Sequence, residues 1–183
     1  MGILENWLVQ IGLRKPQFNI LCLGLDNAGK TSLLHQLRSR MSLSDPIPTV
    51  GLEVQRVSYK NLILTFVDMS GQGSYRNLWQ LYFNSSNAII FVIDGTDKER
   101  MSVVHDELEN IVNFKSTKNS PIVFFVNKMD LSTCISPSEC VEILGINRIK
   151  DRNWTIFACS ALTGDGISDG MMWLTDELIK STK

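Results

Sequence analysis

Hydrophobic residues follow two different periods along this chain, and the two periods alternate from residue 18 onward. The strand-like segments are FNILCLG (18–24), the two-strand ribbon VQRVSYKNLILTFVD (54–68), AIIFVID (88–94), PIVFFVN (121–127) and WTIFACS (154–160). Near-continuous apolar runs such as IIFVI and IVFFV are typical of strands that are buried on both faces of a sheet. The pattern therefore predicts six strands, most of them in a buried parallel sheet.

Between these strands, apolar residues recur at every third or fourth position, which is the spacing of one helix face. Two such faces are formed by Met101, Val104, Leu108 and Ile111 and by Ile167, Met171, Leu174 and Leu178. The segment SPSE (136–139) combines an N-cap serine, a proline at the first helical position and a glutamate, so a short helix should start there. Alternating strands and helices predict a doubly wound α/β domain with helices on both faces of the sheet.

The turn Tyr59-Lys60-Asn61 joins the two strands of the ribbon directly. A direct hairpin in an otherwise parallel sheet places one antiparallel strand at its edge. Because an edge strand carries unpaired backbone groups, we expect this strand to be exposed and available to a partner.

A separate amphipathic helix is predicted at the N-terminus, over residues 3–13. Its apolar face holds Ile3, Leu4, Trp7, Leu8 and Ile11, and Glu5, Asn6 and Gln10 lie toward the other face. Lys15-Pro16 ends this helix. The chain thus divides into an N-terminal helix (1–15) and one larger domain (16–183).

Composition narrows the class of protein. A length of 183 residues with 44% hydrophobic residues suits one well-buried core, and a net charge of −1 argues against an electrostatic nucleic-acid surface. The four cysteines form no CxxC pair, so we expect buried reduced thiols and neither disulfides nor zinc. Since there is no membrane-spanning run and no signal peptide, we expect a cytoplasmic protein.

The segment GLDNAGKT (24–31) matches the phosphate-binding pattern GxxxxGK[ST] and lies between a strand and a helical pattern. Successive N–H groups from Asp26 to Lys30 would face phosphates, Gly29 allows close approach, Lys30 adds a positive charge, and Thr31 offers a hydroxyl to Mg²⁺. The alternative is a plain strand-to-helix turn. The predicted phosphate-binding residues are Gly24, Leu25, Asp26, Asn27, Ala28, Gly29, Lys30, Thr31 and Ser32.

A base-binding segment, NKMD (127–130), follows the buried strand at 121–127. The carboxylate of Asp130 can accept from both N1–H and the 2-amino group of guanine, a pair that adenine does not offer. We expect Asn127 to tie loops together and the Lys128 stem to cover the ring. In the segment SAL (160–162), Ser160 and Ala161 follow the next strand, and the Ala161 N–H would donate to guanine O6.

Taken in order, GLDNAGKT, PTVG (48–51), DMSGQG (68–73), NKMD and SALTGDG (160–166) resemble the motifs of small Ras-type GTPases and, more narrowly, those of the ADP-ribosylation factor family. The likeness covers the whole chain. DMSGQGSYRNLW, AIIFVID and FFVNKMDL most resemble the branch of that family that is associated with cilia and Bardet–Biedl syndrome.

This resemblance implies the P-loop small GTPase fold, with residues 16–183 as the GTP-binding domain. It also implies that Thr49, in the first switch MSLSDPIPTVG (41–51), closes over Mg²⁺ and the γ-phosphate in the GTP state; an ordinary linker is the alternative. Mg²⁺ would be bound by Thr31 and Thr49 and, through a water, by Asp68. The Gly71 N–H would contact the γ-phosphate, and Gln72 would orient the attacking water.

No arginine is obviously aimed at the transition state, and family members depend on an activating protein for that charge. We therefore expect slow intrinsic GTP hydrolysis, with an exchange factor and an activating protein as partners.

The resemblance also gives the N-terminal helix a role as a membrane switch. It would pack on the body with GDP and be released to the membrane with GTP, when the ribbon strands (52–58 and 62–68) shift register; permanent docking is the alternative. Gly2 is a candidate for myristoylation, although Asn6 stands where the consensus asks for Ser or Thr. The implied protein is a monomer, reversibly on membranes at the cilium or basal body, that recruits the coat complex called the BBSome.

Some residues depart from the family pattern. Val67 replaces a tryptophan, Ser70 a glycine and Leu52 a phenylalanine, whereas Tyr82 fits the family, and these sites form the family's apolar effector patch. Three alternatives remain: a nucleotide-held scaffold with negligible hydrolysis, another vesicle-trafficking branch, or a P-loop kinase. NKMD and the lack of an arginine-rich lid speak against the kinase.

Overall fold

The structure is a computed structural model that describes residues 15–40, 42–43, 47–49 and 52–181. The helix predicted for residues 3–13, and Gly2, lie outside the described residues.

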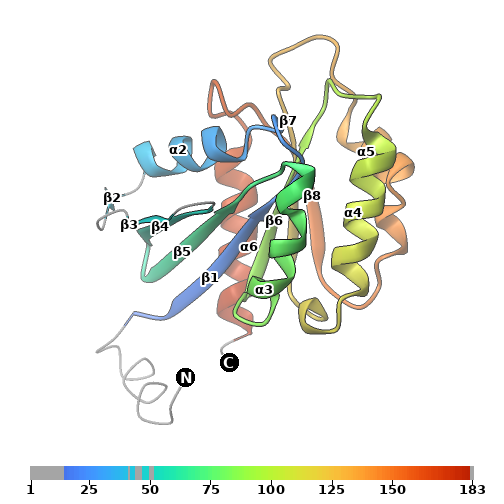
Figure 1. Cartoon of the computed structure of the whole chain (residues 1–183). Coiled ribbons are helices and arrows are strands. Elements are labelled where there is room, and N and C mark those ends of the chain that lie inside the picture. Colours follow the sequence, from blue (N-terminus) through green and yellow to red (C-terminus); the bar gives the residue numbers. More distant parts are fainter. Residues whose placement is uncertain (1–14, 41, 44–46, 50–51, 182–183) are drawn as a thin grey trace.

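Six strands form the main sheet in the order β4-β5-β1-β6-β7-β8 (Figure 1). They are β4 (Leu52–Tyr59), β5 (Leu62–Met69), β1 (Gln17–Leu23), β6 (Ala88–Asp94), β7 (Ile122–Asn127) and β8 (Trp154–Ala158). All neighbours are parallel except β4 and β5, whose antiparallel register pairs Leu52 with Met69 and Tyr59 with Leu62. The predicted six-stranded, mostly parallel sheet is thus confirmed, and so are the bounds of the ribbon strands to within one residue.

The outer edge of β4 differs from the expectation of an open edge strand. Two short strands, β2 (Ser42–Leu43) and β3 (Ile47–Thr49), both pair with β4 in antiparallel fashion. They come from the predicted first switch. Because their backbone groups pair with both halves of β4, that edge is covered and not available to another strand in this state.

Helices cover both faces of the sheet, which confirms the doubly wound arrangement. Apolar residues of α2 (Lys30–Arg40) and α6 (Ile167–Lys180) pack in one core cluster, and those of α3 (Trp79–Phe83), α4 (Met101–Asn113) and α5 (Pro137–Ile143) pack in another. In Figure 1, α3 and α4 lie in front of the sheet and α6 lies behind it. Short 3₁₀ turns complete the fold: η1 (Gly73–Leu78), η2 (Lys115–Thr117) and η3 (Ile146–Arg148).

The predicted helix faces are confirmed. The apolar residues predicted for the faces of α4 and α6 are all buried. At the start of α5, Ser136 and Glu139 form a capping box, with Pro137 at the first helical position. The local signals in the sequence were therefore sufficient to place these helices.

All four cysteines carry free thiols. Cys22, Cys140 and Cys159 are buried, as expected, whereas Cys134 is only partly buried. Burial raises the pKa of both Cys140 and Cys159 to about 12, so these thiols stay un-ionised at neutral pH.

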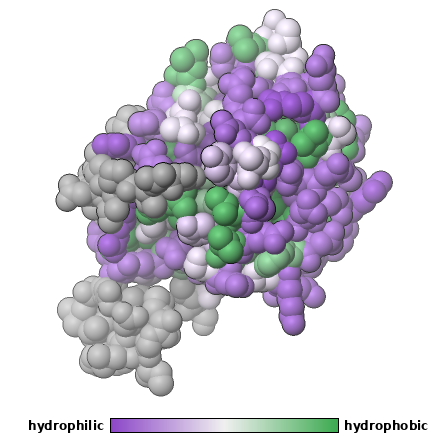
Figure 2. Space-filling model, in the orientation of Figure 1, coloured by the Kyte–Doolittle hydropathy of each residue, from purple (hydrophilic) through white to green (hydrophobic). Residues whose placement is uncertain are grey.

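The surface in the orientation of Figure 1 is mainly hydrophilic, and hydrophobic residues gather in small separate patches (Figure 2). Within the described part of the chain, the large hydrophobic side chains that stand exposed are Tyr75, Leu81, Leu131, Ile143, Leu162, Met172 and Ile179. None of the described helices is both long and apolar enough to cross a bilayer.

Candidate functional site

The loop from β1 to α2 has a backbone that few sequences can adopt. Gly24 and Gly29 have φ of 138° and 90°, and Asn27 has φ of 62°. A Cβ atom on Gly24 would lie 2.2 Å from the Val92 carbonyl oxygen, and one on Gly29 would lie 2.3 Å from Asn127 Nδ2. Both positions thus require glycine, because the positive φ disfavours other residues and the neighbouring atoms leave no room for a Cβ atom.

Lys30, at the first position of α2, folds its side chain back over this loop. Its Nζ donates to the carbonyl oxygens of Gly24 (3.0 Å) and Leu25 (2.9 Å). The residue is buried, and burial lowers the pKa of the Lys30 ammonium. A partly desolvated cation beside a helix N-terminus is a favourable partner for a phosphate.

The next residue connects the loop to β5. Thr31 Oγ1 donates a hydrogen bond of 2.5 Å to Asp68 Oδ2. The other carboxylate oxygen, Asp68 Oδ1, is buried and has no hydrogen-bond partner among the described residues. Burial raises the pKa of Asp68. An unpaired buried carboxylate oxygen is costly, and a cation at this point would relieve that cost.

This donor set fits Mg²⁺. Mg²⁺ is commonly bound by one or two protein oxygen ligands together with substrate phosphates, and it needs no protein cage of its own. No group of three or more His, Cys, Asp or Glu side chains in the described part of the chain is placed to hold a metal. The third predicted ligand, Thr49, lies in β3, where its backbone pairs with Leu52.

Gly71 and Gln72 follow β5, and Gly71 meets the same loop. A Cβ atom on Gly71 would lie 2.3 Å from Asp26 N and 2.5 Å from the Gly24 carbonyl oxygen, so this segment rests directly on the loop backbone. The Gln72 side chain is exposed, and the backbone N–H of Gln72 donates to Ser70 Oγ at 3.4 Å.

The base side of the site is built around Asn127, which is buried at the end of β7. Its Nδ2 donates to the Ala28 carbonyl oxygen and its Oδ1 accepts from the Ala161 N–H, both at 2.8 Å. Asn127 therefore ties three loops together, as expected. Because the Ala161 N–H is already bonded to Asn127, it can contact guanine O6 only by sharing that bond.

The predicted phosphate and base segments line one cavity of about 300 Å³. Its walls include Asn27, Gly29, Ser32, Asn127, Lys128, Asp130, Leu131, Ala161 and Leu162. Asp130 is held at this cavity by Ser160, whose Oγ donates to Asp130 Oδ1 at 2.6 Å. Segments far apart in the sequence thus converge on one ligand-sized space at the carboxyl ends of the strands.

Sequence reasoning missed Asp94. It ends β6, is buried, and binds Lys128 Nζ at 2.5 Å through Oδ2 while its Oδ1 accepts from the Thr96 N–H and hydroxyl. Lys128 has φ of 68°, an uncommon value for a lysine. Asp94 is the last residue of β6, and Asp68 likewise lies at the carboxyl end of β5, so an acidic residue at the end of a strand was a signal for it.

Two arginines were also missed. Arg76 and Arg100 both approach the Asp26 carboxylate, at 3.6 Å and 3.0 Å. No local pattern indicates these pairs, because the partners are far apart in sequence. Val67, which occupies a position of the family's effector patch, is buried in the structure.

Comparison with known proteins agrees with this geometry. The ADP-ribosylation factor family model matches residues 4–178. ADP-ribosylation factor-like protein 6 of Danio rerio is 42% identical over 181 residues, 97% of this chain and 97% of that protein. ADP-ribosylation factor J of Dictyostelium discoideum is 42% identical over 164 residues, 90% of this chain and 87% of that protein.

A solved structure shares the fold as well. The structure of the Arl6 BBS3 small GTPase from Trypanosoma brucei with the bound nucleotide analogue GppNp superposes with a TM-score of 0.81 and 30% sequence identity, over 90% of this chain and 98% of that one. Proteins of this family bind guanine nucleotides and hydrolyse GTP. With this match over nearly its full length, the chain belongs to the ADP-ribosylation factor family and is a small GTPase.

Proposed function

We propose that this GTPase is a GTP-dependent switch that controls the recruitment of a coat or effector complex to a membrane. The observation that supports the nucleotide site best is the double hydrogen bond of Asn127, to Ala28 on the phosphate side and to Ala161 on the base side. A guanine nucleotide has phosphates at one end and a base at the other. It would therefore engage both loops at once and hold them in one arrangement.

Specificity for guanine would come from Asp130, whose carboxylate is oriented by Ser160. The Lys128 stem would cover one face of the ring, with its ammonium held by Asp94. Adenine presents no donor pair to such a carboxylate, so GTP and GDP should be strongly preferred over ATP.

On the phosphate side, the residues of the loop at 24–32 would bind the phosphates, and Thr31, Thr49 and Asp68 would hold Mg²⁺. When bound, Mg²⁺ would neutralise charge on the phosphate oxygens. The Gly71 N–H would contact the γ-phosphate, and Gln72 would orient the attacking water. These roles follow from the family resemblance and from the position of each residue around the loop.

Hydrolysis would be slow without an activating protein. Arg76 and Arg100 contact the loop, but each is bound to Asp26 and to a second carboxylate, Glu107 or Asp97. Since neither guanidinium is free, the transition-state arginine would come from a partner, which in related enzymes accelerates hydrolysis by about 10³–10⁵-fold.

The membrane part of the proposal concerns the N-terminal helix (1–15), with an acyl chain on Gly2 as a second anchor. A single acyl chain binds membranes only marginally, so both elements would act together. The ciliary branch, with the BBSome as the recruited complex, is supported by the likeness to ADP-ribosylation factor-like protein 6 over 97% of this chain.

A second candidate is a vesicle-trafficking switch outside the ciliary branch. Its support is ADP-ribosylation factor J, which reaches the same identity of 42%. Pull-down of purified BBSome by the chain loaded with a non-hydrolysable GTP analogue, compared with the GDP form, separates the two. Equal, weak retention in both states would favour the second candidate.

The switch itself is tested by flotation with lipid vesicles. The full-length chain should float with vesicles when loaded with a non-hydrolysable GTP analogue and much less when loaded with GDP, whereas a chain lacking residues 2–13 should stay unbound in both states. Equal flotation of the full-length chain in both states would rule out the switch and leave a constitutive scaffold.

A further inference from the structure

The peptide that joins Gly71 to Gln72 is held at both of its polar ends. The Gly71 carbonyl oxygen accepts a hydrogen bond of 2.8 Å from Arg76 Nε. The Gln72 N–H donates to Ser70 Oγ at 3.4 Å. A glycine in place of Ser70 would offer no such acceptor, so this arrangement depends on the residue by which the chain departs from its family.

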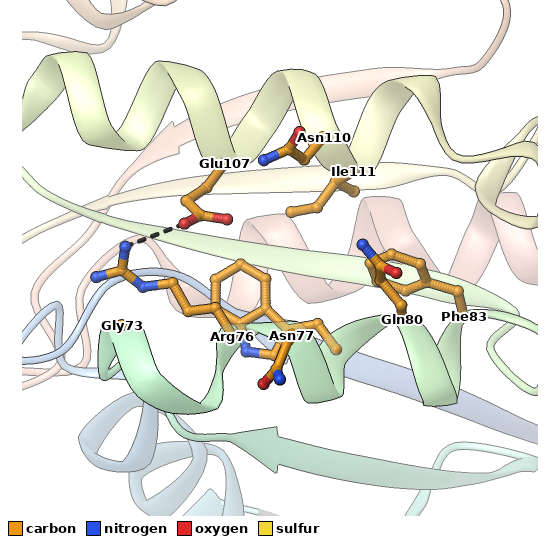
Figure 3. A pocket seen from close by; sticks show the side chains of 9 residues that line it. Gly73, Arg76, Asn77, Gln80, Phe83, Glu107, Asn110 and Ile111 are labelled. Atoms are coloured by element: carbon orange, nitrogen blue, oxygen red, sulfur yellow. Dashed lines mark hydrogen bonds and ion pairs between the residues drawn. The ribbon is translucent and has the colours of Figure 1, made fainter.

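The guanidinium of Arg76 is anchored on two other elements. Its Nη1 lies 3.0 Å from Glu107 Oε1 on α4, and its Nη2 lies 3.6 Å from Asp26 Oδ1 on the phosphate loop. Figure 3 shows the pair with Glu107, which crosses from η1 to α4. The Arg76 side chain is only 14% exposed. A planar fork with five N–H donors can make these contacts together, whereas a lysine ammonium is a single point charge.

A cavity of about 220 Å³ lies next to this ion pair, between the segment 73–83 and α4. In Figure 3, Asn110 and Ile111 come from α4 on one side of this cavity, and Asn77, Gln80 and Phe83 come from η1 and α3 on the other. At this end of the segment, the hydrogen bond from Arg76 to Glu107 links η1 to α4 directly. Through Arg76, the carbonyl end of the Gly71–Gln72 peptide is therefore tied to α4.

Gly71 itself presses against the phosphate loop. Its α-carbon has no room for a side chain, since a Cβ atom would lie 2.3 Å from the Leu25 carbonyl carbon and from Asp26 N. Its N–H makes no hydrogen bond to another described residue. The Gly71–Gln72 peptide is thus held through the Gly71 carbonyl oxygen and the Gln72 N–H. The Gly71 N–H, which belongs to the preceding peptide, is left for a ligand.

We propose that Ser70 and Arg76 are positioning residues for Gln72. They clamp the Gly71–Gln72 peptide from both ends, and Glu107 and Asp26 hold the clamp in place. Neither Ser70 nor Arg76 lines the nucleotide cavity, and both act by restricting where Gln72 can place its side chain. The inference rests on the role of Gln72 under the proposed function.

Loss of either contact should slow intrinsic GTP hydrolysis. Ser70→Ala removes the acceptor, and Arg76→Lys keeps the charge but loses the fork. A hydrogen bond expressed fully in the transition state corresponds to about a tenfold change in rate, and we expect a decrease of about that size for each variant. The GDP dissociation rate should change little in Ser70→Ala, because Ser70 does not line the nucleotide cavity.

The test is single-turnover hydrolysis of γ-labelled GTP by the full-length chain, with GDP dissociation and thermal unfolding measured on the same samples. Ser74→Ala and Arg148→Lys are matched controls, since both residues are exposed and lie outside the clamp. The decisive comparison repeats Ser70→Ala and Arg76→Lys in a Gln72→Ala background. If Ser70 and Arg76 act only through Gln72, the two substitutions should cause no further decrease in the hydrolysis rate in this background.

Two results would overturn the clamp: unchanged or faster hydrolysis in Ser70→Ala and Arg76→Lys, or an equal further decrease in the Gln72→Ala background. Failure of the proposed function looks different. In that case Gln72→Ala alone would leave the rate of GTP hydrolysis unchanged.

Discussion

The side-chain amide of Asn127 donates a hydrogen bond of 2.8 Å to the carbonyl oxygen of Ala28 and so joins the base-binding loop to the phosphate loop. Replacement of Asn127 by Asp would remove this donor and put a carboxylate oxygen against a carbonyl oxygen. We expect GDP dissociation from Asn127→Asp to be faster by about tenfold or more, because both loops lose their common support. Fluorescent-GDP release in the presence of excess unlabelled GDP measures this rate.

The matched control is Asn147→Asp, which makes the same change in charge at an exposed position in η3. It should release GDP at the wild-type rate. If both variants, or neither, accelerated release, the bond between Asn127 and Ala28 would not be what connects the two loops in solution.

Base specificity should follow Asp130. In Asp130→Asn the side chain gains a donor, which suits the 2-oxo group of xanthine better than the 2-amino group of guanine. We expect weaker GDP binding and stronger binding of xanthosine diphosphate than in the wild type. Competition between the two nucleotides for one labelled ligand gives the ratio, and an unchanged preference for guanine would remove Asp130 from the base site.

Mg²⁺ dependence should follow Asp68. Its buried Oδ1 has no partner among the described residues, and Oδ2 is bonded to Thr31. Loss of a group that supports a metal commonly lowers metal affinity by about 10–100-fold. We expect EDTA to accelerate GDP release from the wild type and to have little further effect on Asp68→Asn, whose release should already be fast. Equal acceleration by EDTA in both proteins would place Mg²⁺ elsewhere.

Whether a feature of this structure could be predicted from the sequence depends on how far apart in the chain the interacting residues lie. The face of α4 (Met101, Val104, Leu108, Ile111) and the cap at Ser136 were predicted correctly, because helix periodicity and capping are local. The convergence of residues 27–32 and 127–130 was also expected, since the carboxyl ends of parallel strands meet at one edge of the sheet.

Side-chain pairs between residues far apart in the chain could not be predicted, because no local sequence pattern indicates them. Arg76 meets Glu107 thirty-one positions away, and nothing in the composition around either residue indicates the other. The burial of Val67 had no local signal either: helices cover both faces of the sheet, so alternation along β5 does not reveal which side chains are exposed. The strands β2 and β3 escaped prediction because their segment is short and rich in turn-forming residues.

The ion pair of Asp94 and Lys128 should make stability depend on pH in a defined range. Burial alone would raise the pKa of Asp94, but hydrogen bonds from Lys128 and Thr96 outweigh it, and the pKa is lowered. A carboxyl group with a lower pKa in the folded state stabilises the fold above its unfolded pKa of ~4 and loses this contribution as the pH falls through the folded value.

Asp94→Asn should therefore be less stable than the wild type at pH 7, and the difference should shrink between about pH 5 and pH 3. Urea denaturation at a series of pH values measures it. Asp106→Asn, at an exposed position of α4, is the control and should change stability little throughout. A difference that grew as the pH fell would contradict the lowered pKa of Asp94.

Gly170 allows a sharp test of how closely α6 packs on the sheet. In an open helix interior, replacing glycine by alanine stabilises by about 1 kcal/mol. At Gly170, however, the new Cβ would lie 2.4 Å from Cζ of Phe125, a fully buried residue of β7. Overpacking of this kind costs about 1–3 kcal/mol, so we expect Gly170→Ala to lower the free energy of unfolding overall.

The matched variant is Gly73→Ala, because a Cβ atom at Gly73 would meet nothing within 4 Å. It should be neutral or slightly stabilising in the same urea denaturation experiment, which separates the effect of close packing from the general effect of losing a glycine. If Gly170→Ala were as stable as Gly73→Ala, α6 would have to move away from Phe125 at little cost, and the packing of this helix would be looser than the structure indicates.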